Sequence, residues 1–218
     1  MCVSLAGVAE FLREMRGCDL KKEFVAQECV VAPLCVGGRK FDLRVWVFVR
    51  RFDTEDFEAY MSGFYHARVA DGAWEGGKSL QDETRFYTVG STYKSGGHGE
   101  LMGPEKLKEC LSEQGNTGVD WEGVMGKMGT MCGELFRAGG KVVGKWPRSR
   151  AYYGIDVIVT ADGTPKLVEV NYQGDFEGPK HVAENCGEPE FYEMWKEDLV
   201  KCLFTEEEVE DGKRLIKL

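Results

Sequence analysis

The chain has 218 residues, 43% of them hydrophobic and 11% aromatic, so it can bury a substantial core as one large domain or as two small ones that share a cleft. Its 28 Lys and Arg residues against 37 Asp and Glu residues give a formal net charge of −9. That charge excludes a general nucleic-acid-binding protein, which needs a basic surface. The N-terminal residues lack the basic region of a signal peptide, and no apolar run approaches transmembrane length, so we expect no membrane partner.

Eight cysteines are scattered along the chain, and there are three widely spaced histidines. Several cysteines lie inside apolar runs, which is typical of buried free thiols in a reducing compartment and not of a disulfide framework. The histidines form no zinc-binding pattern. We therefore expect a cytoplasmic protein.

Apolar residues recur at helical spacing in four segments. The first is 4–16, and the second is 104–115, which has proline in its first turn and glycine at its end. Asp120 can cap a third helix, which we expect to end at Gly139-Gly140. The fourth helix is predicted over 189–204.

The most informative strand is 40–50, KFDLRVWVFVR. One face is wholly aliphatic or aromatic, and the other carries Lys40, Asp42 and Arg44. A strand of this kind is packed on one side and available for function on the other, although an ordinary solvated face explains the pattern equally well. Further strands are predicted over 24–31, 58–69 and 85–91, and the second of them places Phe64, His66 and Arg68 on one face.

A β-hairpin is predicted over 152–172, because two β-rich runs flank the turn Ala161-Asp162-Gly163-Thr164. Symmetric folding about this turn pairs Asp156 with Glu169 and Gly154 with Asn171 on one face. The opposite face would then carry four aliphatic residues toward the core: Ile155, Val157, Val168 and Val170.

The predicted pairing brings two carboxylates together. Directly opposed residues have Cβ atoms roughly 4.5–5.5 Å apart, so Asp156 and Glu169 would destabilise the hairpin unless something neutralises them. Mg²⁺ would do so, because it prefers oxygen ligands, and Asn171 would add a neutral oxygen. The alternative is a partly exposed acid paired with a lysine. The combination D-x12-E-x-N in this register favours the metal site.

Antiparallel hairpins with helices grouped apart in the sequence predict an α+β fold, with a mainly antiparallel sheet and helices packed on one side of it. Together the motifs resemble the tubulin–tyrosine ligase family, which has an ATP-grasp fold. The matching pieces, in order, are 27–33 followed by GRKFDLR (38–44), then 64–68, YGID (153–156) and LVEVN (167–171). Members of that family also place the first Asp thirteen residues before the Glu of E-V-N.

The resemblance spans residues 4–204. We therefore expect residues 1–204 to be the C-terminal part of an ATP-grasp domain and 205–218 to be a charged tail. The family's catalytic unit extends further at its N-terminus, where it carries two phosphate-gripping lysines, so we expect this chain to hold the second half of the nucleotide cleft.

The resemblance implies ATP and Mg²⁺ as cofactors. The backbone around Gln27 and Val30 would hold the adenine, and Lys40 and Asp42 would reach the adenine and the ribose. Arg44 and Arg68 would be the catalytic residues that face the terminal phosphates. Asp156, Glu169 and Asn171 would hold the Mg²⁺.

A member of this family would be a peptide ligase that phosphorylates a carboxylate to an acyl-phosphate, which an amine then attacks. Its expected partners are an amino acid and tubulin or another acidic protein tail, which the basic segment 141–150 could meet, and association with microtubules would follow. Two segments depart from the family pattern: 86–93 lacks the histidine and asparagine of H-L-T-N-Y, and 172–175 replaces the usual small residues and proline. A catalytically inactive ATP-grasp module that serves as a scaffold or regulator is therefore the first alternative. A metal hydrolase is the second and weaker one, because no histidine accompanies the acids.

Overall fold

The computed structural model describes residues 27–52, 57–88, 99–114, 119–143, 149–172, 180, 183–184, 186, 189–209, 212 and 214–218. The helix predicted over 4–16 and part of the strand predicted over 85–91 lie outside these residues.

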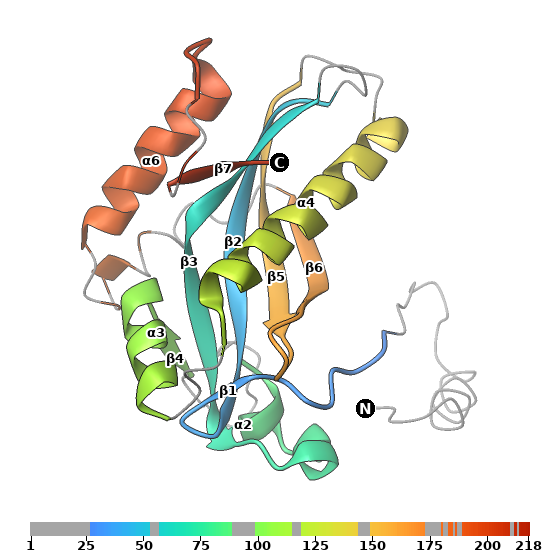
Figure 1. The fold of residues 1–218 in the computed structure, drawn as a ribbon, viewed down its shortest axis with the longest axis vertical. Coiled ribbons are helices and arrows are strands. Elements are labelled where there is room, and N and C mark those ends of the chain that lie inside the picture. Colours follow the sequence, from blue (N-terminus) through green and yellow to red (C-terminus); the bar gives the residue numbers. More distant parts are fainter. Residues whose placement is uncertain are drawn as a thin grey trace, which may run out of the picture.

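A seven-stranded sheet forms the centre of the molecule (Figure 1). Its main path runs through β4 (Glu100–Met102), β3 (Glu58–Ala73), β2 (Arg39–Arg51), β5 (Ala151–Val159) and β6 (Pro165–Tyr172). Two short strands lie off this path: β1 (Cys35–Val36) pairs with β2, and β7 (Leu215–Lys217) pairs with β3. All six pairings between these described strands are antiparallel, which confirms the α+β, mainly antiparallel prediction.

Helices cover both faces of the sheet (Figure 1). On one face lie α3 (Pro104–Glu113) and α4 (Trp121–Val143), and on the other lies α6 (Pro189–Phe204). Two short elements, η2 (Gly76–Gln81) and α2 (Glu83–Phe86), follow β3. The prediction that the helices pack on one side holds for α3 and α4 but is wrong for α6, because part of the second face of β2 is aromatic and needs its own cover.

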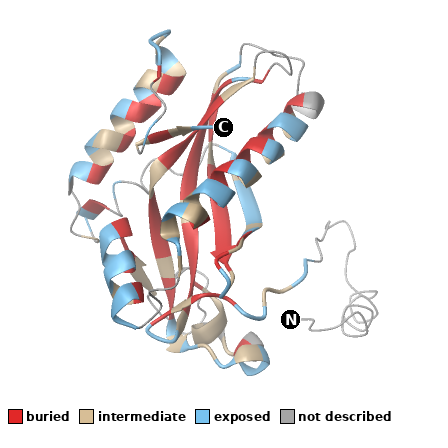
Figure 2. Cartoon of the chain, viewed as in Figure 1, coloured by how far each residue is buried: buried red, intermediate tan, exposed pale blue. Residues whose placement is uncertain are grey.

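The two cores are built from the two faces of the same strands, and the central strands are buried along most of their length (Figure 2). On the α4 side, the aliphatic face of β2 packs against residues such as Val124, Met128 and Phe136. On the α6 side, Trp46 and Phe48 pack against Trp195, whose ring centroid lies 6.1 Å from that of Trp46.

The α6-side face of β2 changes character along its length. Trp46 and Phe48 fill its middle and are fully buried beneath α6. The charged residues Lys40, Asp42 and Arg44 precede them, and Arg50 follows them. We expected the face that carries Lys40, Asp42 and Arg44 to be available for function. The aromatic pair instead separates two charged regions, one at each end of the strand.

The register of the β5–β6 hairpin is confirmed where it matters for the candidate metal ligands. Asp156 pairs with Glu169, and Gly154 pairs with Asn171. Nearer the turn the register shifts by one residue, so that Val157 faces Leu167. The expected core positions of Val168 and Val170 are both wrong, because each is 38% exposed. Val170 keeps its predicted partner, Ile155, so the register shift alone does not account for the exposure.

Three secondary-structure predictions are wrong in part. Residues 83–86 form the helix α2, although a strand was predicted from residue 85. The described part of the strand predicted over 24–31 is not a strand. The helix α4 begins at Trp121 as predicted and continues past Gly140 to Val143.

The C-terminal residues, which we expected to form a solvated tail, are an integral part of the fold. We call residues 205–209 and 214–218 the C-terminal strap. Its strand β7 pairs with β3 through Met61 and Ile216, and Leu215 is only 5% exposed. Apolar burial and ladder hydrogen bonds therefore hold a segment whose charged composition suggested solvation.

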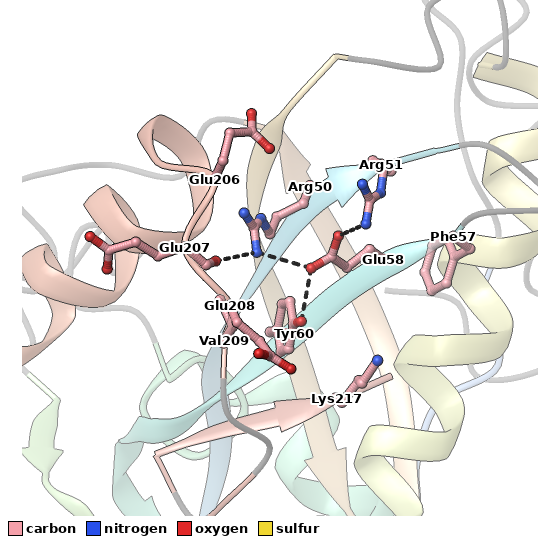
Figure 3. Close-up of a pocket in the computed structure, with 10 residues that line it drawn as sticks. All are labelled: Arg50, Arg51, Phe57, Glu58, Tyr60, Glu206, Glu207, Glu208, Val209 and Lys217. Carbon is pink, nitrogen blue, oxygen red and sulfur yellow. Dashed lines mark hydrogen bonds and ion pairs between the residues drawn. The ribbon is translucent and has the colours of Figure 1, made fainter.

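A cluster of charged residues fastens the strap to the far end of the sheet, beside a polar cavity of about 320 Å³ (Figure 3). Arg50 donates hydrogen bonds to the backbone carbonyls of Glu207 at 2.9 Å and Thr205 at 3.0 Å. It also donates to Glu58 Oε1 at 3.0 Å. Arg150, from the basic segment that could have met an acidic partner, donates instead to the Thr205 carbonyl at 2.6 Å.

Candidate functional site

A pocket of about 680 Å³ lies at the charged end of β2, opposite the end that holds the strap. Its wall combines apolar and charged side chains, a composition typical of small-molecule sites of this size. The lining comes from five parts of the chain: residues 27–32, the start of β2, residues 86–88, the end of β5 with Thr160, and residues 166–168 of β6.

The segment that contains Gln27 and Val30, which we expect to hold the adenine, forms one wall of this pocket. The Gln27 side chain donates hydrogen bonds to the backbone carbonyls of Leu167 at 3.2 Å and Val168 at 3.3 Å. The Ala161 backbone N–H donates to the Ala32 carbonyl at 3.0 Å. The segment is therefore attached to β6 and to the turn of the hairpin, beside the pocket.

Lys40 lies within the pocket wall and is 6% exposed. Its Nζ donates to the Phe86 carbonyl at 2.9 Å and lies 4.1 Å from the centroid of the Phe86 ring. Burial lowers the pKa of this amine, and the negative charge of Asp42 offsets part of that effect. The amine is thus positioned by a carbonyl and an aromatic face, and not by a salt bridge.

Beside the pocket, five side chains form a continuous chain of hydrogen bonds and ion pairs, which we call the site network. Arg44 binds both oxygens of Asp156, with Nε–Oδ1 at 2.5 Å and Nη2–Oδ2 at 3.1 Å. Arg68 lies between two acids, with Nη2 at 3.0 Å from Asp156 Oδ2 and Nε at 2.6 Å from Asp42 Oδ1. The Thr88 hydroxyl donates to the other oxygen of Asp42.

The site network has two positive and two negative charges, so it is balanced without a ligand. Its side chains are 8% to 18% exposed, with Asp156 the most buried and Arg44 the least. Burial works against the charged form of Arg68, but Asp42 and Asp156 together hold its pKa above the usual arginine value. The Arg68 guanidinium is therefore positive at any physiological pH.

The candidate metal ligands provide the oxygen donors that Mg²⁺ prefers. Asp156 is buried, and the side chain of Glu169, directly across from it, is exposed. The side-chain nitrogen of Asn171 is buried and has no hydrogen-bond partner among the described residues. Rotating that amide would present its oxygen instead at no cost in hydrogen bonds, so the donor set fits a hard divalent cation.

Within the described residues, no group of three or more His, Cys, Asp or Glu side chains could hold a metal ion. A cation here would therefore need the Asn171 oxygen, and it would share Asp156 with the two arginines.

The structure thus brings together most of the side chains that the sequence singled out. Arg44, Arg68, Asp42 and Asp156 are in direct contact. Thr88 was not predicted as a site residue. Its position as the threonine of the segment that matches H-L-T-N-Y was the available signal, which the predicted strand obscured.

An antiparallel α+β sheet with a nucleotide-sized pocket at the charged end of one strand defines an ATP-grasp-like arrangement. The chain belongs to the tubulin-tyrosine ligase family, whose family profile matches residues 8–189. That range contains the whole site network and the lining of the pocket. A search of curated proteins found no match. Membership of this family suggests an ATP-dependent ligase of the tubulin–tyrosine ligase type.

Two findings bear on the cellular context. The six cysteines in the described part of the chain are all free thiols. Among the described helices, none is long and apolar enough to span a bilayer.

Proposed function

We propose that this chain binds Mg-ATP in the 680 Å³ pocket and is the ligase module that joins an amino acid to a tubulin tail. One observation carries the proposal: two half-buried guanidiniums converge on Asp156 immediately beside the pocket. Asp42 connects the two regions, because it lines the pocket and also binds Arg68. A triphosphate in the pocket would therefore extend toward Arg44 and Arg68.

The base and the sugar would occupy the wall built from the 27–32 segment and the start of β2. The backbone around Gln27 and Val30 would bind the adenine edge, because the side chain of Gln27 is already bonded to β6. Lys40 would contribute an N–H donor from the opposite side of the pocket. Asp42 would accept from a ribose hydroxyl, in competition with its bond to Thr88.

The phosphates would be bound by Arg44 and Arg68, whose forked donor geometry matches phosphate oxygens. Asp156, Glu169 and Asn171 would hold the Mg²⁺. When bound, this ion supplies charge neutralisation of the transferring phosphoryl group. The two guanidiniums provide the same stabilisation from the protein side, in a position that is fixed before the ligand arrives.

The proposed reaction has two steps. A substrate carboxylate oxygen attacks the terminal phosphorus of ATP, and ADP leaves with the electrons of the broken P–O bond. The amine of the second substrate then attacks the acyl carbon, inorganic phosphate leaves, and the amine loses a proton as the peptide bond forms. The protein contributes positioning and charge stabilisation and forms no covalent bond with the substrate.

A non-catalytic nucleotide-binding scaffold is the second candidate. The sequence SRAYYGIDVIV and the aromatic-rich helix α6 resemble tubulin–tyrosine ligase-like protein 12, a branch in which we expect ligation to be weak or absent. The observation that favours this candidate is the altered segment after E-V-N. It begins with Tyr172, which is 63% exposed, where the family has a small residue.

The test measures binding and ligation separately. Mg-ATP binding is followed by calorimetry, and incorporation of labelled tyrosine, glutamate or glycine is followed on purified tubulin. The ligase proposal predicts ATP-dependent incorporation that is lost in Glu169→Gln and kept in the matched control Glu105→Gln, an exposed glutamate on α3. Binding without incorporation selects the scaffold. Absence of Mg-ATP binding contradicts both candidates, and metal-dependent hydrolysis without ATP would indicate a hydrolase.

A further inference from the structure

A glycine in the middle of β5 lies directly beneath the guanidinium of Arg44. Gly154 is buried and pairs with Trp46 on one side and Asn171 on the other. It is not one of the described glycines with positive φ, so its backbone conformation does not require glycine. Glycine in a strand interior weakens the strand and often marks a place where another group approaches the backbone closely. Its presence here therefore calls for a steric reason.

The steric reason is the position of the Arg44 side chain. A Cβ atom placed on Gly154 would lie 3.1 Å from Arg44 Nη1, 3.2 Å from its Cδ and 3.5 Å from its Cζ. The first two distances are shorter than the optimal separation of about 3.5–4.0 Å between carbon atoms. A side chain at this position would therefore require the Arg44 side chain to move by a few tenths of an ångström.

Arg44 has little freedom to absorb such a shift. Its Nε and Nη2 are both bonded to Asp156, so moving Cδ and Cζ tilts the plane that makes the two bonds. On one flank of Gly154, Trp46 is 1% exposed and packs against Phe191 and Trp195. That side of the site cannot widen without disturbing the second core.

We propose that Gly154 is a positioning residue for phosphate binding: its missing side chain lets Arg44 lie flat on β5 and hold Asp156 with both nitrogens. The inference rests on the proposed function, which supplies Mg-ATP as the ligand. The contact geometry of Gly154 and Arg44 does not depend on that function. Gly154 acts only through Arg44, and it has no contact of its own with the nucleotide. The absence of a side chain at this position thus determines the orientation of the Arg44 guanidinium.

The test is a double-mutant cycle on Mg-ATP affinity. Gly154→Ala is expected to weaken binding about tenfold, comparable with Arg44→Lys, which loses the forked geometry. In the Arg44→Ala background the same glycine substitution is expected to change the affinity by less than about twofold. The matched control is Gly126→Ala, because Gly126 lies in α4 with open space around it; it should leave the affinity unchanged.

A second readout does not depend on the nucleotide. The Arg44 Nε–H resonance in ¹⁵N NMR should shift in Gly154→Ala and not in Gly126→Ala, because its hydrogen bond to Asp156 changes. If Gly154→Ala proves too unstable to assay, its destabilisation should be at least halved in the Arg44→Ala background, since the clash is then removed.

Three results would overturn the inference: an unchanged affinity in Gly154→Ala where Arg44→Lys is weakened, an equal effect of Gly154→Ala with and without Arg44, or an unchanged Nε–H resonance. If the wild-type chain does not bind Mg-ATP but the resonance still shifts, the proposed function fails and the positioning role stands.

Discussion

Two largely buried arginine–carboxylate clusters lie on the same face of β2 and β3, separated by Trp46 and Phe48. They are built from different partners. In the site network, Arg44 and Arg68 bind only carboxylate side chains in the contacts described above. In the cluster at the far end, Arg50 binds one carboxylate and two backbone carbonyls of the C-terminal strap. Side-chain partners can be exchanged for the oxygens of a ligand, whereas backbone carbonyls can be released only by unfolding the strap.

In the far-end cluster, the carboxylate of Glu58 is also occupied by hydrogen bonds from the protein itself. Glu58 accepts hydrogen bonds from Arg50, Arg51 and the Tyr60 hydroxyl (Figure 3). Burial, together with the hydrogen bond to Glu58, raises the pKa of Tyr60 to about 12, so that its hydroxyl remains a neutral donor at physiological pH. The partners of the far-end cluster favour a role in fold stability, whereas those of the site network suit the proposed binding of a ligand.

The largest expected effect is on stability, at the far end. Arg50→Met should lower the free energy of unfolding by about 3–5 kcal/mol, because it leaves Glu58 and two carbonyls without a buried donor. Urea denaturation measures this change. The matched control is Arg51→Met, whose side chain is 44% exposed and which should cost only about 0–1 kcal/mol. If the two substitutions lower the free energy of unfolding equally, the buried Arg50 contributes no more to stability than the exposed Arg51, which contradicts this prediction.

At the site the expected effect is on affinity. Asp156→Asn should weaken Mg-ATP binding about 10- to 100-fold, since a charge-assisted interaction contributes about 1.5–3 kcal/mol. Its effect on unfolding should be smaller than that of Arg50→Met, because the amide oxygen can still accept from one guanidinium. The control Asp120→Asn keeps the N-terminal cap of α4 and should change neither quantity. If Asp156→Asn instead causes a large loss of stability and leaves the affinity for Mg-ATP unchanged, the site network stabilises the fold and does not bind the ligand.

The smallest effect concerns pH and the attachment of the strap to α6. Burial raises the pKa of Asp198 to about 6, and its bond to Arg214 (Nε–Oδ1, 2.7 Å) lowers it only in part. The unfolded value is about 3.9, so between about pH 4 and pH 6 the folded state holds the additional proton. This group therefore favours folding at low pH, and its contribution falls as the pH rises through that window.

Asp198→Asn should remove this pH-dependent contribution to the free energy of unfolding. The difference in unfolding free energy between the wild type and the variant is therefore expected to change between pH 4 and pH 6 and to be constant above about pH 7. Glu197→Gln should reduce this pH dependence without removing it, because the negative charge of Glu197 contributes to the raised pKa of Asp198. A difference that does not vary with pH would show that Asp198 is ionised throughout the range.

The parts of the fold that the sequence predicted are those governed by local periodicity. The bounds of α6 and most of β2 follow from apolar spacing, and the Asp-Gly turn predicts the hairpin. The pairing of Asp156 with Glu169 depends in addition on the register shift between Asp156 and Val157. The second core was missed because Trp46 and Phe48 alternate with aliphatic residues and share a face with charged ones. Only the packing of α6 shows which part of that face is covered.

The candidate site was likewise predicted from the sequence only in part. The polar faces of the strands place Arg44, Arg68 and Asp156 on one side, and the resemblance supplies their roles. The bonds of Asp42 to Arg68 and Thr88 are seen only in the structure, because they join residues that are far apart in the sequence. The strap escaped prediction because its acidic run resembles a solvated tail, while its attachment depends on Arg50, about 155 residues earlier in the chain.

The most direct test of the central claim is the stabilisation of the chain by Mg-ATP, measured as the increase in unfolding free energy on adding the nucleotide. At a concentration one hundred times the dissociation constant, a bound ligand adds about 2.7 kcal/mol. We predict this increase for the wild type and for Arg50→Met, which begins from a lower baseline, and at most a small fraction of it for Arg44→Met. An equal increase in Arg44→Met, or none in the wild type, would contradict the account.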